Sequence, residues 1–316
     1  MLNKTIAKFF VFVILITALS LLSAACSAMN PGGRQESEPA AHSASETTGK
    51  IKSSEVTESS GIAASKCQSD VFWTHNDSGD EAFIYAFNSI GDSLGTWLIP
   101  NVENRDWEDI ATRKDSAGRC FIYIGEIGDN KLLWPEHAVI RVPEPLAAGS
   151  GAPTTRSNAA QTLPGNTVSY VYPDGDHDAE ALMVHPQSGD IFVVTKTESG
   201  PAHVYLIRGD FGCSQEQRAI KVAELSLPAV PNGMVTGGDI SPDGRRIVIC
   251  DYRQAYEFEL PELATDFNEI WKQKAHAFEI GRRKTGEAIC YSVDGTQIFV
   301  TSEGKNPPIT SVRRVK

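Results

Sequence analysis

A short acidic phrase recurs five times along the chain and carries the side chains best suited to hold a cation. In each copy, one or two acidic or small polar residues precede an apolar-small-apolar start to a strand. The copies are Ser60-Gly61-Ile62-Ala63, Glu108-Asp109-Ile110-Ala111, Glu180-Ala181-Leu182, Gly238-Asp239-Ile240-Ser241 and Glu287-Ala288-Ile289. Where such strand starts meet around one axis, their carboxylates repel one another unless a cation lies among them. A hard divalent ion bound through oxygen, most naturally Ca²⁺, satisfies this requirement. The alternative is that the acids cap strand starts or hold water in a polar channel.

The segments that must position these acids are short, β-rich runs separated by turn signals such as Asp243-Gly244 and Asp294-Gly295. Each phrase is followed by a second run, at residues 71–74, 120–124, 190–195, 246–250 and 297–301. A third run follows in each unit, at residues 82–87, 138–142, 203–207, 255–260 and 309–315. Helical periodicity is almost absent; residues 264–274 form the one helix-like stretch.

Repeated units of three or four short strands, each about 40 to 60 residues long, are typical of a β-propeller. Measured between marker residues 61, 109, 180, 239 and 287 within the phrases, the successive spacings are 48, 71, 59 and 48 residues. We therefore predict an all-β propeller of five blades. A sixth blade concealed within residues 145–165 is the alternative. The last unit has room for three strands, and residues 51–57 are expected to supply its fourth, which would close the ring without a free edge.

Antiparallel pairing puts the ends of the second strands at the same face as the starts of the first strands. Four side chains at those ends could act on a ligand: His75, Asp77, Lys196 and Arg253. A bound cation together with Lys196 and Arg253 would suit an anionic small molecule, phosphate in particular, while His75 or Asp77 handles a proton. As alternatives, residues 76–80 form a plain turn, and the two cations simply pair with the acids.

The set of phrases resembles exported bacterial propeller proteins described as TolB-like or phytase-esterase-like. The phrases that carry this resemblance are His75-Asn76-Asp77-Ser78-Gly79-Asp80, Asp106-Trp107-Glu108-Asp109-Ile110-Ala111, Tyr123-Ile124-Gly125-Glu126-Ile127-Gly128-Asp129-Asn130, Asp178-Ala179-Glu180-Ala181-Leu182 and Val235-Thr236-Gly237-Gly238-Asp239-Ile240-Ser241-Pro242-Asp243-Gly244.

The order of residues at the blade starts is also similar to that of the calcium-dependent apyrases, which are five-bladed propellers with a central Ca²⁺. This second resemblance covers about ten residues. It implies metal ligands at Ser60, Glu108, Glu180 and Glu287, with Asp239 where serine would be expected.

The N-terminal segment has the pattern of a secretion signal. Two lysines precede an apolar run over residues 9–22, and the end of the run resembles a bacterial lipobox in which Cys26 is lipidated. We expect a signal peptide at 1–25, a flexible tether at 26–50 and the propeller at 51–316. A plain signal-peptidase cut is the alternative. The predicted location is the cell envelope, where disulfides between some of the other five cysteines are possible; an odd count leaves at least one unpaired.

The composition sets limits on function. The 316 residues hold 29 Lys and Arg against 40 Asp and Glu, a formal net charge of -11, which argues against binding of a nucleic acid polymer. We expect a monomer that meets the membrane through its N-terminal lipid alone. Three functions remain open: a calcium-dependent hydrolase of phosphate esters or anhydrides, a non-enzymatic binding or scaffold protein with a structural ion, and a lyase or lactonase acting on a sugar-type substrate, which shares the same metal-centred geometry. A further acidic run, Asp174-Gly175-Asp176-His177-Asp178, lacks the ligand spacing of an EF-hand.

Overall fold

A computed structural model describes residues 41–147, 152–212 and 215–315. The predicted signal peptide, the lipidation site Cys26 and most of the predicted tether lie outside these ranges, as does Cys213. Within the described ranges, no helix is long and apolar enough to cross a membrane.

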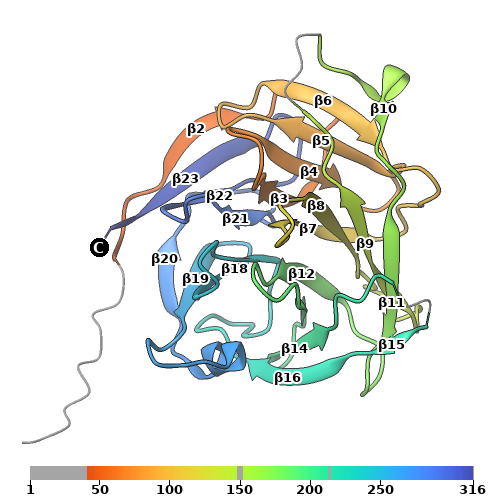
Figure 1. Ribbon diagram of the computed structural model, residues 1–316. Coiled ribbons are helices and arrows are strands. Elements are labelled where there is room, and N and C mark those ends of the chain that lie inside the picture. The colour runs from red at the N-terminus through yellow and green to blue at the C-terminus, as the bar shows by residue number, and fades with distance from the viewer. Residues whose placement is uncertain (1–40, 148–151, 213–214, 316) are drawn as a thin grey trace, which may run out of the picture. The chain divides into compact units, whose positions relative to one another are not determined.

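Five antiparallel sheets, the blades, surround one axis (Figure 1). Blade 1 runs outward as β3 (Ser59–Ala64), β4 (Phe72–Asn76), β5 (Phe83–Phe87) and β6 (Ser93–Leu98). Blade 2 runs as β7 (Trp107–Lys114), β8 (Cys120–Glu126), β9 (His137–Pro143) and β11 (Asn166–Val171). Blade 3 runs as β12 (Ala179–Val184), β13 (Ile191–Thr195), β14 (Ala202–Ile207) and β16 (Ile220–Leu225). Blade 4 runs as β17 (Gly237–Ile240), β18 (Arg246–Cys250), β19 (Gln254–Glu259) and β20 (His276–Glu279). Blade 5 runs as β21 (Ile289–Tyr291), β22 (Gln297–Val300) and β23 (Pro308–Val315), followed by strands from the N-terminal side.

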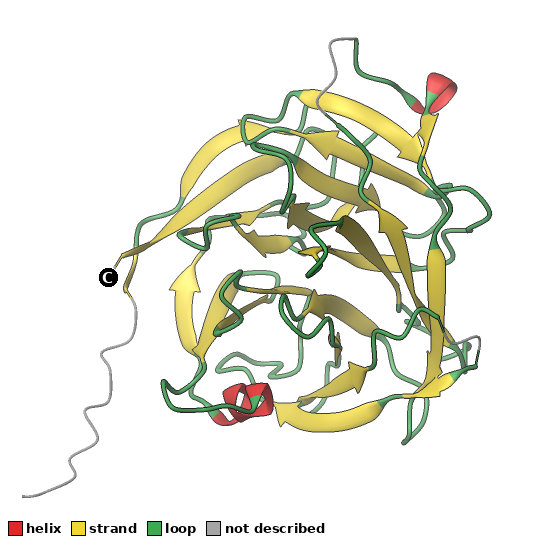
Figure 2. Cartoon of the chain, in the orientation of Figure 1, coloured by secondary structure: helices red, strands yellow, loops and turns green. Residues whose placement is uncertain are grey.

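The prediction of an all-β propeller with five blades is confirmed. Strands and loops make up nearly all of the described chain, and the helix-like stretch contains a 3-10 helix at Phe267–Lys272 (Figure 2). The expected turn chemistry is present, since Gly244 and Gly295 both adopt the positive φ angles that glycine tolerates without strain. The inner strands are buried on both faces because neighbouring blades pack against them, so their apolar residues need not alternate.

The strand that closes the ring lies earlier in the chain than predicted. β2 (Glu46–Lys50) pairs antiparallel with β23, and β1 (Ala41–His42) extends the same edge. Residues 41–50, which we expected to be tether, are therefore part of blade 5. Ile51 and Val56, in the segment expected to be the strand, are instead fully buried between blades 5 and 1. The polar sequence of β2 resembles a linker because an outermost strand is half exposed.

The segment considered as a concealed sixth blade lies, over its residues 152–165, along the outer edge of blade 1. It contributes β10 (Ala160–Gln161), which pairs in parallel with β6, and a short 3-10 helix at Arg156–Asn158. A second parallel addition, β15 (Gln217–Arg218), extends blade 2. These short strands cover edges that would otherwise expose unpaired backbone groups.

A disulfide between Cys67 and Cys120 joins blades 1 and 2 across 53 residues of chain. Cys67 lies in the loop after β3, and Cys120 begins β8. Cys250 and Cys290 are buried free thiols.

Replacing both disulfide cysteines by serine is expected to lower the free energy of unfolding by about 2 to 5 kcal/mol, because the cross-link restricts a long loop in the unfolded chain. Urea titration followed by tryptophan fluorescence measures the loss. Wild-type protein reduced with dithiothreitol is the control and should unfold at the same midpoint as the double variant. Equal midpoints for the oxidised wild type and the variant would contradict the prediction.

Candidate cation site at the blade starts

Three of the five acidic phrases begin with a β-bulge. The pairing of first and second strands skips one residue between Ser59 and Gly61, between Trp107 and Asp109, and between Ala179 and Ala181. The residues left out of the ladder are Ser60, Glu108 and Glu180. A bulge re-aims its side chain and bends the strand, so the same local irregularity repeats at the same place in blades 1, 2 and 3.

The bulged glutamates lie within a dense group of carboxylates. Ligand oxygens of Asp77, Asp106 and Glu108 lie within 4.8 Å of one another, and so do those of Glu108, Asp178 and Glu180. Glu108 belongs to both groups. We call these five residues the carboxylate cluster; its acidic groups could hold an ion, because each carboxylate offers an oxygen ligand of the kind that hard cations prefer.

Gly128 allows the cluster to form. A Cβ atom at this position would lie 2.7 Å from Asp106 Cγ and would overlap Glu108 Oε1. The Gly128 amide also donates a hydrogen bond to the carbonyl of Asp106 at 3.2 Å. The close approach of backbone to carboxylates therefore requires glycine here.

Ser60 lies against this cluster from blade 1. Its hydroxyl donates to the carbonyl oxygen of Glu108 at 2.8 Å and lies 3.4 Å from Glu108 Oε2. Two of the predicted metal ligands, Glu108 and Glu180, are thus brought together, with Ser60 beside the first. Glu287, the predicted ligand from blade 5, is buried and belongs to neither group of three acids.

Among the ion pairs of the described residues, those that involve the carboxylate cluster are made by Lys196. It follows β13, and its Nζ pairs with Glu180 and lies 4.0 Å from Asp178 Oδ2. A single lysine leaves most of the cluster's negative charge unbalanced.

The pKa values of several buried acids reflect this excess of negative charge. Burial, and then the charge of Asp77, raises the pKa of Asp106 to about 6. Burial is also the first cause that raises the pKa of Glu108 well above its usual range, and it raises the pKa of Asp178. Burial and the neighbouring Glu303 carboxylate raise the pKa of Glu287 to about 8. Such shifts mean that ionising these groups opposes folding unless a cation is bound.

Metal-free protein should therefore lose stability as the pH rises from 5 to 9. The folded protein retains protons on Asp106 and Glu287 at pH values where the unfolded chain has lost them, so the contribution is present at low pH and disappears through about pH 6 and 8. At about 1.4 kcal/mol per pH unit and group, the two shifts amount to about 5 kcal/mol between pH 5 and 9, so in EDTA we expect the melting temperature to fall by roughly 10 °C or more.

Two further melting series test the pH prediction. The variant Glu287→Gln should show a shallower fall, and added Ca²⁺ should flatten the curve of the wild type. A melting temperature in EDTA that is constant or rises from pH 5 to 9 would count against the assignment.

Asp239 does not join the cluster. Its carboxylate accepts hydrogen bonds from the backbone amides of Ile240 at 2.8 Å and of Tyr291 at 2.9 Å, so it ties blade 4 to blade 5. Blade 4 has no bulge at its first strand, because Gly237–Ile240 pair continuously with β18. Gly238 therefore stands where the other blades carry Ser60, Glu108, Glu180 and Glu287.

Asp109 has the corresponding role at the centre of the propeller. Its carboxylate accepts from the amides of Ile110 at 2.8 Å, Leu182 at 2.9 Å and Gly238 at 3.4 Å, which belong to blades 2, 3 and 4. A Cβ at Gly61 of blade 1 would lie 2.8 Å from Asp109 Oδ1. Asp109 and Asp239 therefore follow the alternative interpretation, in which the acids cap strand starts by accepting hydrogen bonds from backbone amides.

Of the four ligand-contacting side chains predicted, Asp77 belongs to the carboxylate cluster and Lys196 contacts it. His75 is fully buried; it packs edge-on against Trp107 with ring centroids 5.7 Å apart, and its Nδ1 lies 2.9 Å from the Asn76 carbonyl. Burial is the first cause that lowers the pKa of His75. Arg253 is exposed, and no ion pair within the described chain joins it to the cluster.

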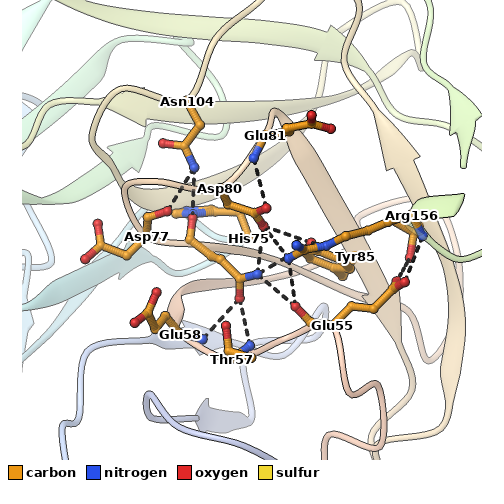
Figure 3. A network of polar contacts seen from close by, with 12 residues as sticks. Glu55, Thr57, Glu58, His75, Asp77, Asp80, Glu81, Tyr85, Asn104 and Arg156 are labelled. Atoms are coloured by element: carbon orange, nitrogen blue, oxygen red, sulfur yellow. Dashed lines mark hydrogen bonds and ion pairs between the residues drawn. The ribbon is translucent and has the colours of Figure 1, made fainter.

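The turn after β4 is held by a network that fixes the backbone of Asp77 (Figure 3). The Asn76 side chain donates to Asp80 at 2.8 Å, and Arg156 pairs with Asp80 at 2.6 Å. Asn104 donates to the Asp77 carbonyl at 3.0 Å. Residues 76–80 thus form a turn, as the alternative held, and that turn delivers Asp77 to the carboxylate cluster.

A cavity of about 430 Å³ opens beside the cluster. Asp178 and Lys196 line it, together with His177, His203 and the segment from Thr197 to Ser199. Its volume suits a small molecule.

Two members of the cluster were missed from the sequence, Asp106 and Asp178. Each precedes a bulged glutamate by two residues, so the pattern Asp-x-Glu occurs at both blade starts. The repeat of that spacing is the signal that could have identified them.

The fold and the site define a five-bladed β-propeller with a carboxylate cluster at its blade starts. No known family's sequence profile matches the chain, and no curated protein matches it significantly. A similar solved structure is a gluconolactonase from Xanthomonas campestris, 12% identical, with a TM-score of 0.45 over 86% of this chain and 89% of that chain. The propeller assignment rests on the strand pairing described above, and the resemblances to TolB-like, phytase-esterase-like and apyrase proteins stay predictions.

Proposed function

We propose that this propeller binds Ca²⁺ at the carboxylate cluster and hydrolyses phosphate esters or anhydrides in the adjoining cavity. The observation that carries the proposal is the position of Glu108, whose carboxylate belongs to two groups of three acids at once. Calcium is favoured over magnesium because it accepts six to eight oxygen ligands in irregular geometry, whereas magnesium demands a near-ideal octahedron.

The chain's own residues suit an anionic ligand beside that ion. Lys196 lies at the junction of the cluster and the cavity, where its ammonium group can bind a phosphate oxygen. Asp77, whose carboxylate belongs to the cluster, is the residue we propose to handle the proton. The bound ion would supply electrostatic stabilisation of the charge that develops on the phosphoryl group.

We further propose that the protein is an exported, monomeric lipoprotein of the cell envelope, anchored through Cys26. The disulfide between Cys67 and Cys120 supports this location, because such bonds persist mainly in oxidising compartments.

Activity assays on purified protein test the enzyme. Nucleotides and simple phosphate esters are incubated with the protein in Ca²⁺ and in EDTA, and the release of phosphate is measured. Turnover that requires Ca²⁺ and is lost in Glu108→Gln is the expected result. Absence of turnover on every substrate, with Ca²⁺ bound, would overturn the hydrolase.

A second candidate function is a non-enzymatic binding or scaffold protein in which the same ion holds the blades together. It is favoured by two observations: Lys196 is already paired with Glu180, and His75 is enclosed away from solvent. In that case chelation lowers the melting temperature while no substrate is turned over. An unchanged melt in EDTA would rule out the structural ion.

A further inference from the structure

A second group of metal-ligating side chains lies on blade 3, and two of its members, His177 and His203, line the same cavity. Asp174 and His177 belong to the loop between β11 and β12, and His203 and Tyr205 belong to β14. Ligand atoms of Asp174, His177 and His203 lie within 4.8 Å of one another. This group has no member in common with the carboxylate cluster.

Two of the distances within this group are close to those between the ligands of a small tetrahedral ion, and the two shorter ones are hydrogen bonds of the Tyr205 hydroxyl. His177 Nε2 lies 3.2 Å from Asp174 Oδ1, and the Tyr205 hydroxyl lies 2.6 Å from that oxygen. The same hydroxyl is 2.8 Å from His177 Nε2 and 3.2 Å from His203 Nδ1. With metal–ligand bonds of about 2.0 Å, two ligands of a tetrahedral zinc ion stand about 3.3 Å apart.

The fold holds these side chains in place. His203 and Tyr205 are two residues apart on one strand and so project from the same face of blade 3. The His177 ring packs edge-on against Tyr172 and His203, with centroids 5.0 Å and 5.2 Å away. Glu224 Oε1 lies 3.9 Å from His203 Nε2, the nitrogen that faces away from the group, so its negative charge is near that ring although the two are not hydrogen-bonded.

We propose that Asp174, His177 and His203 form a binding site for Zn²⁺ or a similar divalent transition metal. Asp174 Oδ1, His177 Nε2 and His203 Nδ1 are the ligands, and the Tyr205 hydroxyl or a solvent molecule takes the fourth position. Two imidazoles and one carboxylate select such a metal over calcium, which prefers oxygen ligands alone.

The surroundings leave this site accessible and available. Lys221 contacts the other Asp174 oxygen, Oδ2, at 3.6 Å, so Oδ1 is left to His177 and Tyr205, the side chains that share the proposed site. The side chains of His177 and His203 are 20% and 26% exposed, which gives an ion a path through the cavity.

Titration of tag-free, EDTA-treated protein with ZnCl₂ in excess Ca²⁺ tests the site by calorimetry. Wild type is expected to bind one Zn²⁺, and His177→Gln and His203→Gln should each weaken the affinity at least tenfold. Co²⁺ in place of Zn²⁺ should give visible d–d absorption that both variants lose. The control His276→Gln, on the outer strand of blade 4, should bind like the wild type.

The outcomes distinguish this site from the carboxylate cluster. Glu108→Gln should keep Zn²⁺ binding, and His203→Gln should keep Ca²⁺ binding. Absence of Zn²⁺ binding to the wild type would overturn the proposal, and so would Zn²⁺ affinity that is unchanged in both histidine variants or lost in Glu108→Gln.

Discussion

The variant Glu108→Gln should no longer be stabilised by calcium, and in EDTA it should melt at a higher temperature than the wild type. Glu108 is the carboxylate that both groups of three acids share, so its loss removes one ligand and one negative charge from each group. A ligand present at 100 times its dissociation constant stabilises a folded protein by about 2.7 kcal/mol, and the variant should lose most of that gain.

The opposite effect in EDTA follows from the raised pKa of Glu108, which arises first from burial and then from Asp77. Each unit by which a folded-state pKa is raised costs about 1.4 kcal/mol when the group ionises, and glutamine removes that cost at pH 8. The amide of the variant side chain would also keep an oxygen that can accept a hydrogen bond from Ser60.

Differential scanning calorimetry at pH 8, with Ca²⁺ and with EDTA, measures both effects. The control is Glu262→Gln, an exposed glutamate far along the chain from any blade start, which should melt like the wild type in both buffers. If calcium stabilised Glu108→Gln as strongly as the wild type, the carboxylate cluster would not be the cation site.

The variant Asp109→Ala is expected to lower the free energy of unfolding by about 3 to 5 kcal/mol. Asp109 is fully buried, and its carboxylate satisfies amides of three blades, among them Leu182 and Gly238. Alanine leaves those amides without a partner in the interior, and each unpaired buried donor costs about 1 to 3 kcal/mol.

Chemical denaturation at a fixed Ca²⁺ concentration measures this loss. Asp210→Ala, which removes an exposed aspartate from a surface loop, is the matched control and should change stability by less than about 0.5 kcal/mol. A similar small effect for Asp109→Ala would mean that the blades are held at the axis without this carboxylate.

Part of the candidate cation site was predictable because the residues of each blade start recur in the sequence. The phrases at Glu108 and Glu180 mark first strands, and both residues lie in the cluster. Asp239 shows the limit of the same reasoning. A shift of one position along the strand, together with the absence of a bulge, turns its carboxylate toward the backbone of Tyr291.

The candidate catalytic residues divide in a similar way. Asp77 and Lys196 were found because residues that end second strands meet the starts of first strands. His75 ends such a strand too, but its ring is covered by Trp107 of the next blade. Packing between blades depends on residues distant in sequence, so no local pattern distinguishes His75 from Asp77.

The sequence by itself determined the blade count, the order of strands and the concentration of acids at the blade starts, because these follow from local patterns that repeat. The tertiary structure decided which of those acids meet. Bulges at Ser60, Glu108 and Glu180 re-aim their side chains, Gly128 admits the carboxylates, and Asp106 and Asp178 complete the cluster. The recurring acidic residues thus form both a candidate cation site and the hydrogen-bonded centre of the propeller, because one step along a strand reverses the direction of a side chain.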